Sequence, residues 1–270
     1  VGRVSFVTAL GSNYIALARG GGFGLLATLA FLLPTERRLL ARLTLWAMAA
    51  LQVLAALTAG ARGPVLALIL SFMFFFVLSV RGFPQLRIER FALRLGALTF
   101  MVFIAITIAG QELFPTLVSR TRIALTGVDI SLLTRLELYR AALALWGESP
   151  IWGKGSGQFG LVVAGEDIRS YPHNIVLELG AETGIIGVFI FVIMVGVAFV
   201  EGLRGVYSGN GLRKTVARYL LVISCFALLN AMVSGDINDN RVLFTTLALL
   251  ALTPRLQREL TPGGDGGLAR

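Results

Sequence analysis

Residues 169–192 read RSYPHNIVLELGAETGIIGVFIFV, and they join the only histidine of the chain, His173, to a long apolar run. This run, residues 183–200, contains no charged side chain. An α-helix needs about 20 apolar residues to cross roughly 30 Å of hydrocarbon. This stretch therefore predicts a helix that crosses a membrane and has an imidazole near its start.

The composition of the whole chain supports a membrane protein. Of the 270 residues, 56% are hydrophobic and 14% are charged, and the mean hydropathy is +0.80. A water-soluble domain has nearly twice that share of charged residues. The apolar runs do not alternate as barrel strands do, so they predict helices that satisfy their own backbone groups. We expect an all-α, polytopic integral membrane protein with about seven spans, at 13–33, 43–59, 64–80, 92–110, 184–200, 219–235 and 241–254.

The basic residues predict the orientation of these spans. More than half of the 24 Lys and Arg residues lie in four segments that fall on one side if the spans alternate: 34–42, 81–94, 201–218 and 255–260. Cytoplasmic loops carry this excess, so the net charge of +9 is interpreted as a topology signal and not as a nucleic-acid surface. The opposite, periplasmic side then holds the turn at Arg62, residues 236–241 and one large loop that contains amphipathic helices.

These boundaries divide the chain into four parts. Membrane helices occupy 1–110, the periplasmic loop with the candidate site occupies 111–183, further membrane helices occupy 184–260, and 261–270 is a flexible tail. Because the chain starts at Val1 without a methionine, we expect a fragment that lacks earlier helices. The single cysteine, Cys225, lies inside a span and cannot form an intrachain disulfide.

Within the large loop, LLTRLELYRAALALWGESP predicts an amphipathic helix. Thr134 and Glu137 have the spacing of a capping box, and Gly147 and Pro150 end the helix at about Trp146. Arg135 would then lie in the first turn, where a cation opposes the helix dipole unless an anion binds there. The alternative is a solvated arginine at a helix start.

The next segment, GESPIWGKGSGQFG, contains a formal G-x-G-x-x-G at Gly155, Gly157 and Gly160. No strand precedes it, and Lys154 is followed by glycine where a P-loop requires Ser or Thr, so a nucleotide loop is not expected. A flexible connecting loop is the better interpretation. Lys154 remains a candidate contact for a phosphate.

Three further residues combine charge or proton chemistry with an apolar setting. His173 precedes a helix that enters the bilayer, where it is either a proton acceptor or an interfacial side chain without chemistry. Arg62 lies in a tight Gly- and Pro-containing turn between two spans, as a functional group or as a side chain that snorkels to the headgroups. Arg19 lies deeper, and the following GGG would allow close approach of a helix or a ligand.

Several of these pieces together resemble the O-antigen ligase and O-antigen polymerase superfamily of bacterial envelope proteins. The resemblance covers most of the chain and rests on the opening SNY helix, AGARGPVLAL at 59–68, RLELYRAALAL with SPIWGKGSGQF, and HNIVLELGAETGIIG. The last two segments, in that order, are the most specific. In place of the Ser that usually precedes the family's first arginine, this chain has Ala61.

The resemblance implies a metal-independent glycosyltransferase of the bacterial inner membrane with its active face in the periplasm. The donor would be a glycan on undecaprenyl pyrophosphate, and the acceptor lipid A–core, another lipid-linked repeat unit or a protein; no cofactor is implied. By resemblance, His173 is the general base and Arg62 and Arg135 bind the diphosphate. Secondary candidates are Arg19, Arg140, Lys154 and Arg169.

Two rival hypotheses belong to other classes. A transporter of an anionic lipid-linked glycan would use the same arginines but would need no general base. The two halves of the chain show no internal repeat of the kind that many transporters have. A structural membrane subunit would need neither the arginines nor the histidine.

Overall fold

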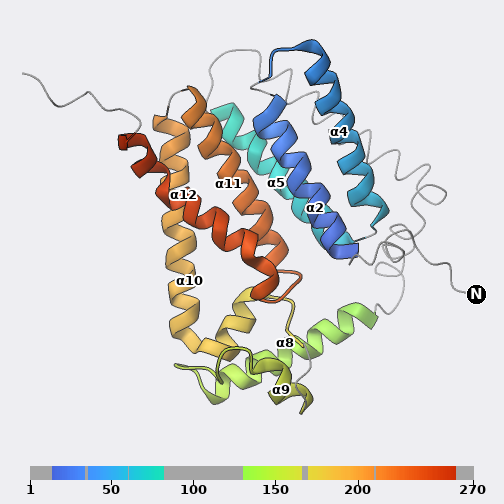
Figure 1. The fold of residues 1–270 in the computed structure, drawn as a ribbon. Coiled ribbons are helices and arrows are strands. Elements are labelled where there is room, and N and C mark those ends of the chain that lie inside the picture. Colours follow the sequence, from blue (N-terminus) through green and yellow to red (C-terminus); the bar gives the residue numbers. More distant parts are fainter. Residues whose placement is uncertain are drawn as a thin grey trace, which may run out of the picture.

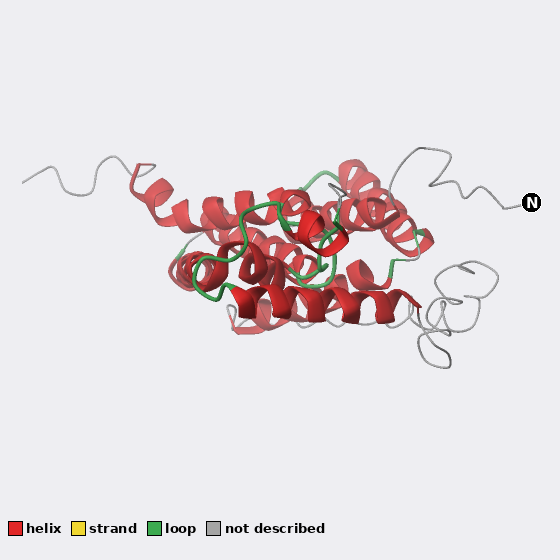
Figure 2. Cartoon of the chain, turned by 90° about the horizontal axis from the view of Figure 1, so that it is seen from below, coloured by secondary structure: helices red, strands yellow, loops and turns green. Residues whose placement is uncertain are grey.

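The computed structural model describes residues 14–33, 36–59, 61–81, 130–165, 170–209 and 211–259. Within these residues all regular structure is helical, which confirms the all-α prediction (Figures 1 and 2). The elements are α2 (Tyr14–Ala27), the π-helical turn η1 (Thr28–Leu32), α4 (Leu39–Thr58), α5 (Arg62–Arg81), α8 (Ile130–Glu148), α9 (Phe159–Ala164), α10 (Ile175–Ser208), α11 (Gly211–Ala231), the 3-10 turn η2 (Asn238–Asn240) and α12 (Arg241–Glu259).

Four helical segments of the described chain are long and apolar enough to cross a membrane. They are Tyr14–Leu32, Leu39–Leu57, Ile175–Ser208 and Arg213–Ala231. These correspond to four of the seven predicted spans, while α5 contains a shorter apolar helix, Arg62–Leu78. The predicted span 92–110 lies outside the described residues, and the span at 241–254 corresponds to α12, which does not meet the same criterion. Seven spans and the large periplasmic loop therefore stay predictions.

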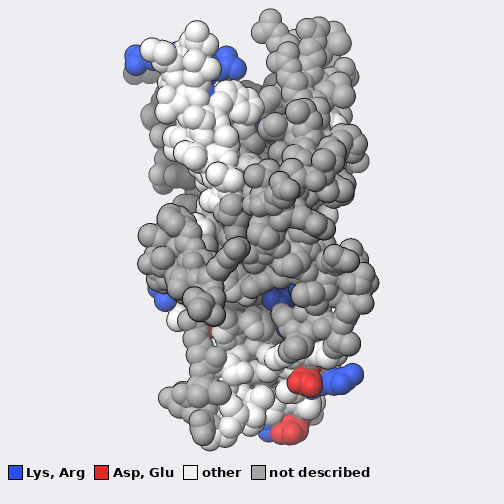
Figure 3. Space-filling view, turned by 90° about the vertical axis from the view of Figure 1, so that its right-hand side faces the viewer, with Lys and Arg blue, Asp and Glu red and all other residues white. Residues whose placement is uncertain are grey.

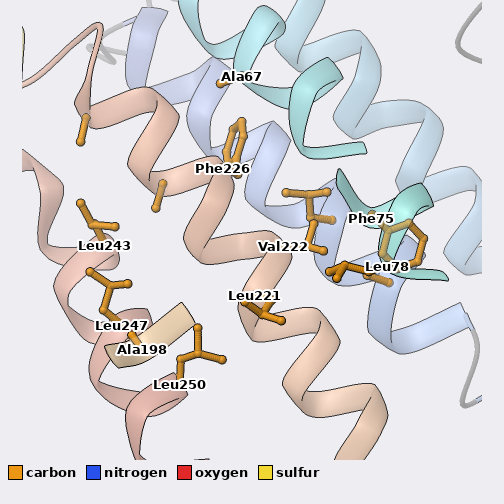
Figure 4. Packing of buried hydrophobic residues seen from close by; sticks show 14 of the residues in the cluster. Ala67, Phe75, Leu78, Ala198, Leu221, Val222, Phe226, Leu243, Leu247 and Leu250 are labelled. Atoms are coloured by element: carbon orange, nitrogen blue, oxygen red, sulfur yellow. The ribbon is translucent and has the colours of Figure 1, made fainter. Parts of the chain in front are cut away.

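The main core lies where α5, α10, α11 and α12 meet. Phe226, Leu221 and Val222 of α11 are fully buried there, against Leu243, Leu247 and Leu250 of α12 and Phe75 and Leu78 of α5 (Figure 4). Small residues let the helix backbones approach closely, as membrane helices require. The sequence prediction for the GGG stretch is confirmed: a Cβ on Gly21 would lie 2.8 Å from the Gln52 carbonyl of α4, and one on Gly22 would overlap the Phe226 ring.

The candidate site residues lie at one end of the helix bundle. In Figure 1, α8 and α9 lie beyond the lower ends of α2, α5 and α11, and Figure 2 shows α8 lying across this end. Among the described atoms of the face in Figure 3, charged side chains lie at the top and in the lower half of the view.

Helix α10 is bent where its membrane segment begins. Gly184 has φ 66° and ψ −162°, so the first turns, from Ile175, and the long remainder are two helices joined at a sharp corner. This backbone conformation is essentially restricted to glycine. The corner turns the N-terminal turns of α10 back toward the end of α11, where Arg19 and His173 also lie.

Candidate functional site

His173 lies directly before α10, in a backbone conformation that is unusual for its residue type. Its φ is 56°, and it is the one non-glycine residue with positive φ in the described chain. Its ring packs edge-on against Tyr171, with 4.5 Å between the ring centroids, and its buried Nδ1 atom has no hydrogen-bond partner. A strained residue that keeps an unsatisfied polar atom is typical of a functional site.

The surroundings of His173 favour the neutral imidazole. Burial lowers the pKa of His173 below its ordinary value of 6.5, and the positive charges of Arg135 and then Arg19 lower it further. A neutral imidazole can accept a proton at neutral pH. Both arginines are therefore close enough to interact electrostatically with the His173 ring, although they are far from it in sequence.

Arg135, one of these two arginines, lies in the interior of α8. The helix begins at Ile130, so the capping box predicted at Thr134 and Glu137 is wrong, and Arg135 is not in the first turn. The helix also continues past the predicted end at Trp146, as far as Glu148. The argument that free N–H groups and Arg135 bind one anion together therefore fails, because residues 130–134 are already helical before Arg135.

Arg19 connects α2 to the turn after α11. Its guanidinium donates to the backbone carbonyls of Ser234 at 2.5 Å and Asn230 at 3.4 Å, and its buried Nε atom has no partner. A Cβ on Gly235 would lie 3.1 Å from both Nη atoms. Asp236 and Asp239 lie close enough to interact with its charge. Arg19 is therefore held firmly beside His173, with two carboxylates nearby.

Arg62 lies at the first position of α5, at the same end of the bundle. The preceding Ala61 packs with Ala18 and Ala59 in a small buried cluster. The following Gly63 lies close to Val233: a Cβ on Gly63 would be 3.1 Å from the Val233 side chain. Arg62 therefore belongs to the neighbourhood of α2 and of the turn after α11.

The start of α10 is fixed to this same turn by two polar side chains. Asn174 caps the helix by accepting from the N–H groups of Val176 and Leu177, at 3.0 and 3.1 Å, and donates to the Met232 carbonyl at 3.2 Å. Glu178, which is 4% exposed, accepts from the N–H of Ile237 at 3.1 Å through Oε1, while its buried Oε2 has no partner. The start of a helix near His173 or Asn174 was predicted correctly.

The glycine-rich loop is organised around a carboxylate of the protein itself. Buried Glu182 accepts from the N–H groups of Gly157 at 2.8 Å and Phe159 at 3.4 Å, and its backbone carbonyl accepts from Gly155 at 2.9 Å. These N–H groups therefore already bind an anionic side chain. That finding agrees with the expectation that the G-x-G-x-x-G pattern is no nucleotide loop.

The secondary candidates have different positions. Lys154 pairs with Glu148 at 2.6 Å, and its backbone N–H donates to Ala181 at 2.8 Å. Arg140 is exposed on α8, five residues after Arg135 and therefore on another face. Arg169 lies outside the described residues. Within the described chain, no group of three or more His, Cys, Asp or Glu residues is placed to hold a metal ion.

Sequence reasoning missed the residues that build the support of the site. Asn230 and Ser234 contribute backbone carbonyls, for which no residue type gives a signal. Glu178 and Glu182 lie four residues apart on α10, and their separate partners, Ile237 and Gly157, belong to chain segments distant in sequence.

The chain matches a known protein family over its middle region. A family model described as O-antigen ligase matches residues 43–192, a region that contains Arg62, Arg135 and His173. The comparison with curated proteins found no match to the chain. Because the family model covers more than half of the chain, this membrane protein belongs to the O-antigen ligase family.

Proposed function

We propose that the protein transfers a glycan from undecaprenyl pyrophosphate to an acceptor hydroxyl at the periplasmic face of the bacterial inner membrane. The proposal builds on membership of the O-antigen ligase family, which indicates glycan transfer of the ligase or polymerase type. The observation that supports it best is His173, a half-buried imidazole whose pKa is lowered by burial and by the charges of Arg135 and Arg19. Ligation to lipid A–core is the step we propose first.

The reaction requires two functions from the protein. The acceptor oxygen attacks the anomeric carbon of the glycan, the bond from that carbon to the pyrophosphate oxygen breaks, and undecaprenyl pyrophosphate leaves. A ring nitrogen of His173 accepts the proton of the attacking hydroxyl. Arg62 and Arg135 stabilise the negative charge that grows on the diphosphate, the role that a metal ion has in other transferases.

The test uses the full-length protein in lipid nanodiscs, with a labelled undecaprenyl-diphosphate glycan as donor. Lipid A–core, a second lipid-linked repeat unit and a candidate glycoprotein are supplied separately as acceptors. We expect product with one of them, in the presence of EDTA as well. Donor that binds without glycosylating any acceptor would overturn the proposal, and activity lost in EDTA and restored by Mg²⁺ would overturn metal independence.

The role of His173 is tested in the same assay. His173→Ala is expected to abolish product formation while donor binding persists. Arg204→Gln is the matched control, because Arg204 pairs with Glu201 near the C-terminal end of α10, remote from His173. Equal product from His173→Ala and the parent protein would refute the base assignment and leave the transfer reaction itself standing.

A further inference from the structure

Ile151 and Trp152 form an exposed apolar tip in the loop between α8 and α9. Trp152 is 74% exposed and Ile151 is 54% exposed. The backbone that carries them is ordered by hydrogen bonds on both sides: Gly153 donates to Ser149 at 2.9 Å, and Ile185 donates to Pro150 at 2.8 Å. Two large apolar side chains are therefore held outward by a well-fixed loop.

The tip contacts α10 where its membrane segment begins. A Cβ on Gly184 would overlap the carbonyl group of Ile151, so the loop and the corner of α10 touch through their backbones. The side chains that follow on α10 are large, apolar and exposed: Ile185, Ile186, Phe189 and Ile190. Since α10 is a membrane-spanning candidate, this row faces acyl chains, and the tip extends the same surface.

The same loop also carries polar side chains. Lys154 pairs with Glu148, which is itself exposed, and Ser156 lies exposed two residues further on. Tryptophan combines an apolar ring system with one N–H donor and is enriched where acyl chains meet headgroups. A loop that carries both an apolar tip and a charged pair fits this boundary better than bulk water or the middle of the bilayer.

We propose that Ile151 and Trp152 insert into the lipid bilayer at the boundary between acyl chains and headgroups, beside the start of the membrane segment of α10. Side chains of interfacial elements reach about 5–10 Å into this boundary. The inserted tip holds the loop between α8 and α9 at a fixed depth. Because this loop also binds the corner of α10, it fixes the depth of the helix start that follows His173.

The test measures depth directly and needs no substrate. In protein whose single cysteine, Cys225, is replaced, one cysteine is introduced at a time and labelled with a nitroxide: Trp152→Cys, Phe189→Cys as the acyl-chain reference and Ser156→Cys as the loop control. Collision rates with oxygen, which concentrates in lipid, and with a water-soluble nickel chelate are measured in nanodiscs. We expect the chelate to reach position 152 severalfold less often than position 156, with position 189 deeper than both.

Two results would overturn the proposal. Equal access of the chelate to positions 152 and 156 would place the tip in water. Low access of both oxygen and the chelate at 152, with an immobilised nitroxide spectrum, would mean that protein covers the tip. Neither result depends on glycan transfer, so this inference fails or stands independently of the proposed activity.

Discussion

Replacing Gly184 by alanine is expected to detach the loop at 150–158 from α10. Gly184 has φ 66° and ψ −162°, a conformation that alanine adopts only with strain, and the new Cβ would overlap the Ile151 carbonyl group. Both effects act on the contact between the corner of α10 and the loop. Three backbone hydrogen bonds of 2.8–2.9 Å cross this contact, from Ile185 to Pro150, from Lys154 to Ala181 and from Gly155 to Glu182.

The size of the effect follows from these contacts. Strain in such a backbone conformation costs about 1–3 kcal/mol. Hydrogen bonds of this kind contribute about 0.5–1.5 kcal/mol each. If the loop moves away to relieve the strain, one or more of these hydrogen bonds break. A net destabilisation of about 2–4 kcal/mol of the closed loop is therefore expected. It corresponds to roughly 30- to 700-fold faster local opening, since 1.4 kcal/mol is about tenfold in an equilibrium.

Amide hydrogen exchange by mass spectrometry measures this opening in full-length protein in nanodiscs. Peptides that cover residues 149–158 and 178–188 should exchange faster in Gly184→Ala. The control is Gly196→Ala, in the same helix, where a Cβ would meet no atom within 4 Å. Alanine there should be neutral or stabilising by up to about 1 kcal/mol. If both variants exchange like the parent protein, the corner does not hold the loop.

Three further variants test the surroundings of His173 and of the loop. Arg135→Gln removes a positive charge that lowers the pKa of His173, so that pKa should rise and the acid limb of the kcat/KM–pH profile should move to higher pH; an unmoved limb would disprove the coupling. Arg19→Gln removes the donors to the carbonyls of Ser234 and Asn230, so activity should fall and the amides of residues 232–237 should exchange faster. Arg19→Lys should give an intermediate exchange rate, and parent-like exchange in Arg19→Gln would show that Arg19 does not hold the turn after α11. Glu182→Ala removes the acceptor of the buried Phe159 N–H and of the Gly157 N–H, which should cost about 1–3 kcal/mol and lower Tm, while Glu182→Gln should lose less; equal Tm values for the two variants would contradict a specific role of the carboxylate.

Local sequence signals predicted the helical fold and the start of α10, but they did not predict the bend in α10 or the helical residues before Thr134 in α8. Apolar runs of about 20 residues are directly visible, so the four membrane-spanning helices follow from composition. The start of α8 was misplaced because Thr134 and Glu137 fit a capping box by spacing alone, whereas the helix continues toward the N-terminus to Ile130. Tertiary context often overrides a local cap pattern, and no local signal marks which of two starts is used.

The sequence indicated which residues belong to the candidate site, but it did not indicate how they are arranged in space. An arginine or histidine in an apolar chain is conspicuous because burial of a charge is costly, so His173, Arg62 and Arg19 could be selected from the sequence. The contacts of Arg19 with Ser234, over 200 residues away, depend on the packing of α2 against α11. Packing of that kind leaves no trace in local spacing.

The corner at Gly184 explains how one helix serves both the membrane and the site. If the 34 residues of α10 formed one straight helix, it would be about 51 Å long, and its first nine residues would extend about 13 Å beyond Gly184 along the axis. His173 would then point away from the bundle. The corner instead returns these residues to the turn after α11, where Asn174 donates to Met232 and Glu178 accepts from Ile237. The loop at 150–158 satisfies the backbone groups that the break exposes. The position of the imidazole therefore depends on a glycine eleven residues away and on the loop that binds the corner around that glycine.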